Sequence, residues 1–407
     1  MNEINVGLAR VTGGVTAAKG FKASGVAAGL KRNGQLDLAL IVSEVPASVA
    51  GVYTTNLVKA APLELTRQRV SLGTARAVIV NAGNANACTG TRGIPDAQAM
   101  AAAAAKGLAI PEEQVLVAST GVIGVPLPVE KIVNAVSAAV AALSRENHTS
   151  AAQAIMTTDL VPKECAVQLE IQNSTVTIGG MAKGSGMIHP NMATMLGFIT
   201  TDAAISSEVL QLALKQAVDD SFNMITVDGD TSTNDMVLVL ANGQAGNPEI
   251  KPDTEDYRRF CSGLTRVCTE LAKMIARDGE GATKLIEVQV KGAPTRRDAR
   301  LAARAVVGSN LFKAAVFGRD ANWGRILCAL GYSGAHFDPS QADIFIGHVQ
   351  VAKDGGAVVF DEAKATEMLS QDPVQVLVDL KAGSHTATAW GCDLTYEYVR
   401  INGSYRT

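Results

Sequence analysis

The residues that could carry out chemistry are concentrated near the middle of the chain, in the stretch 183–203. Lys183 is followed by a Gly-Ser-Gly segment, and Pro190-Asn191 gives a turn signal. Met-Ala-Thr-Met-Leu then opens an apolar run typical of a strand. Thr194 therefore stands where a turn is expected to become a buried strand. An ordinary strand threonine would give the same local pattern, so this structural interpretation stays open.

Self-cleavage is one route by which a threonine becomes a nucleophile, because its hydroxyl is weak until a base activates it. The Thr194 oxygen would attack the carbonyl of Ala193, and water would then cleave the resulting ester. The freed α-amine, with a reference pKa of roughly 7.7–8.0, suits a general base near neutral pH. Small Ala193 leaves its carbonyl accessible, and the Gly/Pro/Asn-rich approach can hold an unusual backbone geometry.

The elements that must position this stretch are strands and helices mixed along the whole chain. With 407 residues, 47% of them hydrophobic, the chain can form a large core in two or three domains or subdomains. It shows no regular βαβ rhythm and no GxGxxG at a strand end. We therefore predict an α+β fold, a layered α/β sandwich of mixed sheets flanked by helices.

The expected elements follow from periodicity and from capping and turn residues. A glycine-rich coil is expected over 20–35. Strands are expected at 36–42, 75–80, 115–119, 165–171, 175–178, 236–240, 285–290, 344–346, 358–360 and 386–401. Helices are expected at 95–108, 129–143, 151–156, 206–218, 257–277, 296–307 and 361–369.

Charge and composition exclude several classes of partner. The net charge is −3 and aromatic residues make up 4%, which argues against nucleic acid and anionic membranes as partners. The N-terminus lacks a signal pattern, and the alanine-rich run 99–110 is too short to span a bilayer, so we expect a cytoplasmic protein. The six cysteines form no CxxC pair, so buried free thiols are expected and zinc is not.

Other polar positions are candidates for a site. Thr120-Gly121 ends the strand 115–119, where free backbone N–H groups could stabilise an oxyanion. Glu280 lies between two glycines and could meet a bound cation or remain a solvated loop acid. The loop 81–90 fits either ordinary turn chemistry or a site lining. The loop 228–235 is rich in acids but lacks the terminal glutamate of a calcium loop, so no metal is predicted.

Familiar hydrolase patterns are missing from the sequence. It contains no GxSxG elbow and no HExxH motif. His189 is close to Thr194 in sequence, but a neighbour in an extended segment usually points elsewhere. A nucleophile that carries its own amine fits this lack of a histidine base.

Eight segments, in order along the chain, resemble the ornithine acetyltransferase family, the glutamate N-acetyltransferases of arginine biosynthesis. The resemblance covers essentially the full chain, and so many matches in order are highly specific. The central match is Lys-Gly-Ser-Gly-Met-Ile followed by Pro-Asn-Met-Ala-Thr-Met-Leu. The segments are 81–86, 119–124, 157–163, 183–196, 228–235, 279–283, 322–325 and the terminal Tyr-Arg-Thr.

The resemblance implies an Ntn-like enzyme that cleaves itself between Ala193 and Thr194. Residues 1–193 would form an α chain that carries the oxyanion site, and residues 194–407 a β chain that begins with the nucleophile Thr194. Thr120 and Gly121 match the oxyanion pair of the family. The positions that match its substrate-binding residues are Thr157, Lys183, Thr194, Glu280, Asn402 and Thr407.

The implied reaction is a ping-pong transfer of acetyl from N-acetylornithine to glutamate through acetyl-Thr194, without metal or organic cofactor. Some members of the family also accept acetyl-CoA, which is a third candidate partner. The expected assembly is an α2β2 heterotetramer. An autoprocessed amidohydrolase or aminopeptidase is the alternative, since the residue types do not reveal whether water or an amine resolves the acyl-enzyme. A binding or structural protein is disfavoured, because a structural chain break needs no such polar set.

Overall fold

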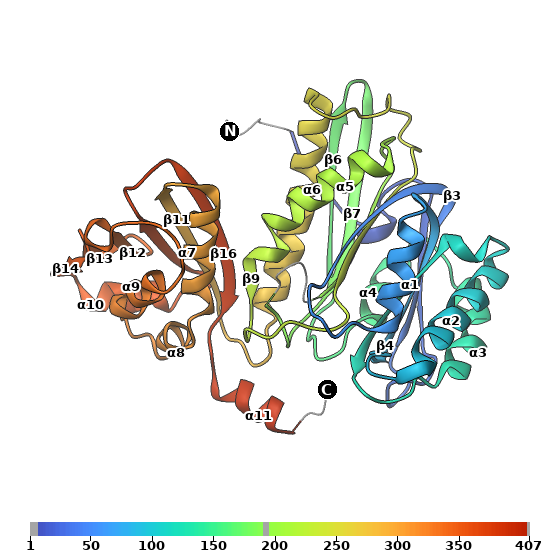
Figure 1. Ribbon diagram of the computed structural model, residues 1–407, viewed down its shortest axis with the longest axis horizontal. Helices are drawn as coiled ribbons and strands as arrows, with labels where there is room; N and C mark the ends of the chain where they lie inside the picture. The colour runs from blue at the N-terminus through green and yellow to red at the C-terminus, as the bar shows by residue number, and fades with distance from the viewer. Residues whose placement is uncertain (1–6, 190–194, 405–407) are drawn as a thin grey trace.

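The computed structural model describes residues 7–189 and 195–404, shown in Figure 1. Three residues singled out above, Ala193, Thr194 and Thr407, lie outside the described residues. Within the described ranges, nine strands form one mixed sheet and seven form a second, with helices packed between and around them. The predicted α+β class with layered mixed sheets is confirmed.

The first sheet has the order β1-β6-β7-β8-β10-β3-β4-β5, with β2 paired to β3. Neighbours β4 and β5 run parallel, as do β8 and β10, and the other pairs of the sheet are antiparallel. Its strands are β1 (Ala9–Val11), β2 (Phe21–Val26), β3 (Leu38–Tyr53), β4 (Thr74–Asn84), β5 (Val115–Val122), β6 (Lys163–Ile171), β7 (Ser174–Lys183), β8 (Leu196–Thr201) and β10 (Met236–Ala241).

Both faces of this sheet are buried where β3, β4 and β5 run side by side. Along β3, Leu38 and Leu40 face one hydrophobic core, and Ala39 and Ile41 face another. This alternation follows from the two-residue period of a strand, and it explains why each of these strands contains a continuous apolar run, at 38–42, 77–80 and 115–118. The helices on this half of the molecule are α1 (Ala61–Val70), α2 (Gly93–Leu108), α3 (Val129–Ala141) and α4 (His148–Ala154).

The second sheet has the order β14-β13-β12-β15-β11-β16-β9. Helix α7 packs on β11 and β16. The strands are β9 (Ile225–Thr226), β11 (Leu285–Ala293), β12 (Asp343–Ile346), β13 (Val349–Lys353), β14 (Gly356–Ala357), β15 (Val374–Asp379) and β16 (His385–Cys392). The helices that follow β11 are α7 (Arg296–Gly308), α8 (Asn310–Gly318), α9 (Trp323–Gly331) and α10 (Glu362–Leu369).

Helix α6 (Glu255–Arg277) joins the two sheets, because it contacts β6 and β7 of the first and β11 and β16 of the second. It also packs against α5 (Ser207–Asp219), whose first turn is capped by Ser206: the Ser206 side chain accepts from the Val209 N–H at 3.4 Å. One continuous core holds side chains of both sheets and of these helices. After β16 the chain leaves the second sheet and forms α11 (Tyr396–Ser404), which extends away from it in Figure 1.

Several sequence-based boundaries were wrong. The coil expected over 20–35 contains β2, and the expected strand 386–401 ends at Cys392 and is followed by α11. Residues 358–360 form no strand, and helices α8 and α9 were not predicted. Of the six free thiols, four are buried as expected, but Cys88 and Cys328 are exposed. In the part of the chain that the structure describes, no helix combines the length and apolar character needed to cross a membrane.

Candidate active site

A cavity of about 230 Å³ lies where the ends of β5, β7, β8 and β10 meet the loop after α6 and helix α11. Six of the predicted site residues line it, although they come from segments far apart in the sequence: Thr120, Gly121, Thr157, Lys183, Glu280 and Asn402. The other described residues around it are Ile123, Thr158, Gly186, Met187, Ile188, Met195, Leu196, Asp228, Asp230, Ser232, Thr233, Asn234, Asp235 and Tyr398.

The residue that follows the expected nucleophile in the sequence contributes to this cavity. Met195, the residue after Thr194, lines the cavity, and its carbonyl accepts from the Met236 N–H at 3.1 Å. Lys183 is the last residue of β7 and lies opposite Leu196 in the antiparallel pairing with β8. The lysine is therefore held at the start of the strand that Thr194 precedes. Lys183 is 8% exposed, so its ammonium is largely removed from solvent.

Thr120 and Gly121 lie within β5, which continues to Val122, so the predicted strand end at residue 119 was wrong. The pairing of β4 with β5 becomes irregular next to Thr120, around Gly83. Gly121 has φ = +128°, and a side chain there would collide with the backbone of Gly83. Glycine is thus required, and the irregular pairing is the local feature that can free backbone N–H groups for a ligand.

Asn234 ties this strand end to the loop 228–235. Its side-chain amide donates to the carbonyl of Ala85 at 2.6 Å and to that of Ser119 at 2.8 Å. The backbone beside Thr120 and the loop before β10 are therefore fastened together by one buried amide. The acid-rich loop, which suggested a calcium loop only superficially, serves as part of the cavity wall.

Glu280 lies against Gly186 so closely that a side chain at position 186 would collide with its carboxylate. The Asn402 Nδ2 donates to Glu280 Oε2 at 2.8 Å and to the Tyr398 carbonyl at 3.1 Å. Glu280 is 7% exposed and therefore is not a solvated loop acid. Asn402 reaches it from helix α11, whereas the sequence pattern placed Asn402 directly after an expected strand that ended at residue 401.

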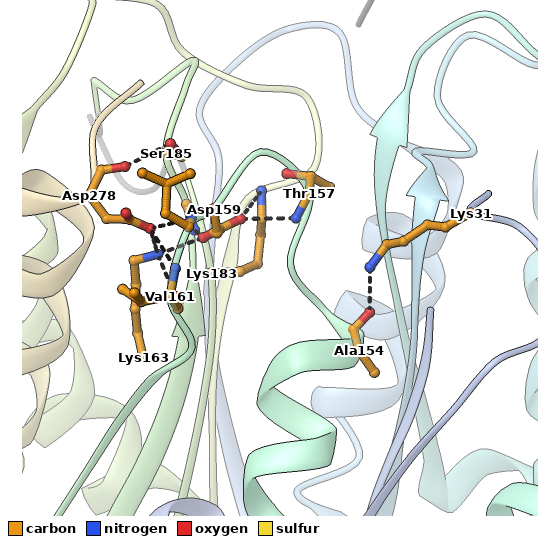
Figure 2. A network of polar contacts seen from close by, with 11 residues as sticks. Lys31, Ala154, Thr157, Asp159, Val161, Lys163, Lys183, Ser185 and Asp278 are labelled. Atoms are coloured by element: carbon orange, nitrogen blue, oxygen red, sulfur yellow. Dashed lines mark hydrogen bonds and ion pairs between the residues drawn. The ribbon is translucent and has the colours of Figure 1, made fainter. Parts of the chain in front are cut away.

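Thr157 is fixed by Asp159, whose Oδ2 accepts from the Thr157 N–H at 2.9 Å. The same Oδ2 lies 3.8 Å from Lys183 Nζ, and Oδ1 accepts from Lys163 Nζ at 2.7 Å (Figure 2). Burial opposes ionisation of this carboxyl, but the charges of Lys183 and Lys163 outweigh it and hold the pKa of Asp159 below its usual range. Asp159 is therefore an anion between two lysines.

Asp228, the first acid of the loop 228–235, accepts hydrogen bonds from the protein backbone. Asp228 accepts from the N–H groups of Met187 and Ile188, at 2.6 and 2.8 Å, and so shapes the segment that leads to the proposed cleavage site. Among the residues that the structure describes, no group of three or more His, Cys, Asp or Glu side chains is arranged to hold a metal ion.

His189 is engaged on both ring nitrogens, Nδ1 with Thr226 Oγ1 at 3.0 Å and Nε2 with an Arg304 nitrogen at 3.1 Å. Burial, and then the charge of Arg304, lower the pKa of His189. These contacts direct the ring toward α7 and β9.

Asp235 is a cavity-lining residue that the sequence did not single out. It is 3% exposed, and its Oδ2 has no hydrogen-bond partner among the described residues. Burial raises the pKa of this carboxyl well above its usual value. Its place at the end of an acid-rich loop gave no signal of this burial.

Comparison with known proteins gives a consistent result over the whole chain. The ArgJ family profile matches residues 22–407. The arginine biosynthesis bifunctional protein ArgJ of Symbiobacterium thermophilum is 63% identical, over 98% of this chain and 99% of the relative. That of Caldanaerobacter subterraneus subsp. tengcongensis is 53% identical, over 97% and 99%.

A solved structure agrees. The crystal structure of arginine biosynthesis bifunctional protein ArgJ from Bacillus halodurans matches with a TM-score of 0.51 and 52% identity. The match covers 52% of this chain and 100% of the solved chain. Family profile, sequence relatives and fold therefore lead to one conclusion. The chain belongs to the ArgJ family, the ornithine acetyltransferase enzymes of arginine biosynthesis.

Proposed function

We propose that this enzyme moves the acetyl group of N-acetylornithine to glutamate through an acetyl ester on Thr194. The observation that carries the proposal is the placement of one buried cation, Lys183, and one buried anion, Glu280, on the same small cavity. N-acetylornithine carries the complementary pair, an α-carboxylate and a side-chain ammonium. A cavity of about 230 Å³ suits a small ligand such as an amino acid, since pockets for drug-sized ligands measure about 300–1,000 Å³.

Self-cleavage prepares the nucleophile. The Thr194 oxygen adds to the Ala193 carbonyl carbon, the peptide C–N bond breaks, and water hydrolyses the ester to leave a carboxylate on Ala193 and a free amine on Thr194. The products are the α chain 1–193 and the β chain 194–407. The solved ArgJ chain of Bacillus halodurans supports such a division, because all of it matches only 52% of this chain.

In the first half-reaction, the Thr194 oxygen attacks the acetyl carbon of N-acetylornithine while the Thr194 amine takes the hydroxyl proton. Thr120 and Gly121 stabilise the oxyanion. The acetyl C–N bond then breaks, the proton passes to the leaving nitrogen, and ornithine departs. In the second half-reaction the amine of glutamate attacks the ester, the C–O bond breaks, and the proton returns to the Thr194 oxygen.

Substrate recognition follows from charge. Lys183 binds the α-carboxylate that both substrates carry, and Glu280, oriented by Asn402, binds the ammonium of the ornithine side chain. Thr157 and Thr407 complete the set of substrate-binding residues.

No cofactor is needed for this reaction. Because the relatives are described as bifunctional, we add acetyl-CoA as a second acetyl donor. We further propose an α2β2 heterotetramer located in the cytoplasm.

A transfer assay tests this function directly. Purified enzyme with N-acetylornithine and glutamate should form ornithine and N-acetylglutamate in equal amounts, with parallel-line ping-pong kinetics. Acetyl-CoA with glutamate should also yield N-acetylglutamate if acetyl-CoA serves as the second donor. Rapid release of acetate that does not depend on glutamate would instead identify an amidohydrolase.

Replacing Glu280 by glutamine should lower kcat/KM for N-acetylornithine by roughly 10- to 100-fold. A charge-assisted contact contributes about 1.5–3 kcal/mol, and about 1.4 kcal/mol corresponds to a factor of ten. Self-cleavage should persist, because it involves the Ala193–Thr194 bond and not the substrate. The measurement is initial rate against N-acetylornithine concentration for processed enzyme.

Glu287→Gln is the matched control, because Glu287 contacts Lys273 and Trp390 away from the cavity. It should retain the kcat/KM of the unmodified enzyme. N-acetylnorvaline, which lacks the side-chain ammonium, provides a second check. Glu280→Gln should not lower kcat/KM for this donor, because it has no ammonium for Glu280 to bind. Equal kcat/KM values for N-acetylornithine in the unmodified enzyme and in Glu280→Gln would show that Glu280 does not recognise the donor.

A further inference from the structure

A cluster of buried charges adjoins the cavity and meets its lining at Lys183. Lys163 has 0% exposure, and its Nζ donates to Asp159 Oδ1 at 2.7 Å and to Asp278 Oδ2 at 2.6 Å (Figure 2). Lys163, Asp159 and Asp278 are not among the described residues that line the cavity. With Lys183, the cluster contains two cations and two anions, so its charge is balanced, as buried ions require.

The Asp159 carboxylate serves two lysines at unequal distances. Its Oδ1 accepts from Lys163 Nζ at 2.7 Å and from the Gly184 N–H at 2.6 Å. Its Oδ2 accepts from the Thr157 N–H, while Lys183 Nζ lies 3.8 Å away, beyond hydrogen-bond length. Lys163 thus forms the close charge-assisted contact with Asp159, and Lys183 feels only its longer-range attraction.

The second carboxylate of the cluster connects to the segment that carries Glu280. Asp278 Oδ2 accepts from the Leu160 N–H at 3.0 Å, and its backbone carbonyl accepts from Ser185 Oγ at 2.7 Å. The Glu280 N–H in turn donates to the Ser185 carbonyl at 3.1 Å. Lys163 therefore binds two carboxylates, one beside Lys183 and one beside Glu280.

We propose that Lys163 is a positioning residue that holds the Asp159 carboxylate away from Lys183 and so keeps the Lys183 ammonium available for the α-carboxylate of the substrate. The proposal rests on the function proposed above. Without the Lys163 charge, Asp159 would close the 3.8 Å gap and bind Lys183 directly, as N⁺–H···O⁻ pairs do at about 2.7–2.9 Å. The substrate carboxylate would then have to displace Asp159.

A purely structural function of Lys163 makes a different prediction. Loss of one partner from a buried ion pair destabilises a fold in general. Such a loss of rigidity would lower kcat/KM for every substrate by a similar factor. A direct ion pair between Lys183 and Asp159 would lower kcat/KM only for substrates that carry the α-carboxylate. N-acetyl-1,4-diaminobutane is N-acetylornithine without that carboxylate. We define the donor ratio as kcat/KM for N-acetylornithine divided by kcat/KM for N-acetyl-1,4-diaminobutane. A fall in this ratio reports weaker recognition of the α-carboxylate.

Two double variants with the same number of charges provide the test. Lys163→Met with Asp278→Asn leaves Asp159 to pair with Lys183, and the donor ratio should fall about tenfold or more. Lys163→Met with Asp159→Asn leaves a neutral amide beside Lys183, and the ratio should stay within about threefold of that of the unmodified enzyme. Both are assayed after self-cleavage and a folded circular-dichroism spectrum have been confirmed. Equal ratios in the two double variants would overturn the proposal.

The single variant Asp159→Asn is a further test that retains the Lys163–Asp278 pair. Its donor ratio should equal or exceed that of the unmodified enzyme, because nothing then competes for Lys183. A tenfold fall would mean that Asp159 holds Lys183 in its productive position, which contradicts the proposal even if neither double variant folds. An unmodified enzyme that transfers no acetyl from N-acetylornithine would instead refute the proposed function, so the two failures are distinguishable.

Discussion

Replacing Thr194 by alanine should leave the chain uncut and abolish acetyl transfer. The hydroxyl that attacks Ala193 and the hydroxyl that accepts the acetyl group are the same atom, so one substitution removes both steps. Removal of a covalent nucleophile costs on the order of 10⁶ in kcat. On a denaturing gel the unmodified protein should give two fragments, with the smaller ending at Ala193, and the variant should give one band. Intact-mass measurement fixes the cleavage position.

Thr194→Ser is the matched control, because it keeps the hydroxyl and loses only a methyl group. It should still cleave and transfer acetyl, at a reduced rate. The decisive contrary result is an unmodified chain that stays intact and yet is fully active, because Thr194 would then have no free amine to act as the base.

The buried strands could be predicted because their whole surroundings are apolar. β4 and β5 face cores on both sides, so residues 77–80 and 115–118 are unbroken apolar runs. Strand β2 was not predicted, because a glycine interrupts its apolar pattern. Gly25 weakens its strand pattern, but a side chain there would collide with the Ser150 carbonyl at the start of α4. This glycine serves a close approach between elements, which local sequence does not reveal.

The C-terminal helix was missed because tertiary contacts end the preceding strand. The alternating pattern of 386–401 favours one long strand, yet β16 stops at Cys392. Asp393 is buried, and its Oδ1 accepts from the N–H groups of Thr283 and Lys284, at 2.8 and 3.0 Å. Thr395 Oγ1 then donates to the Gly281 carbonyl at 2.7 Å. These bonds fasten the chain to the loop of Glu280, and α11 begins there.

The members of the site could be predicted only through the family resemblance, because each was an ambiguous local signal. The sequence could not show which contacts position these site residues in the folded protein. Lys163 and Asp278 are 115 positions apart, so their contact has no local signature. The raised pKa of the Asp235 carboxyl likewise depends on its burial in the folded molecule. Positioning and protonation are therefore properties of the packed structure.

Replacing Thr120 by alanine should lower kcat by about 10²–10³-fold, the usual cost of losing one oxyanion-hole donor. The substitution removes the hydroxyl from the cavity wall and keeps the β-strand backbone, so folding should survive. Steady-state kcat of the processed variant with N-acetylornithine and glutamate is the measurement. Because an oxyanion also forms when Thr194 attacks Ala193, slower self-cleavage is a second readout.

Thr120→Ser separates the hydroxyl from the backbone. It retains the donor and should remain within a fewfold of the unmodified kcat, whereas turnover of Thr120→Ala at the unmodified rate would remove the side chain from the oxyanion site. The backbone N–H of Gly121 cannot be tested as simply, because a side chain at this position, with φ = +128°, would collide with Gly83. The position that requires glycine therefore coincides with the irregular pairing of β4 with β5 and lies next to Thr120 on the cavity wall.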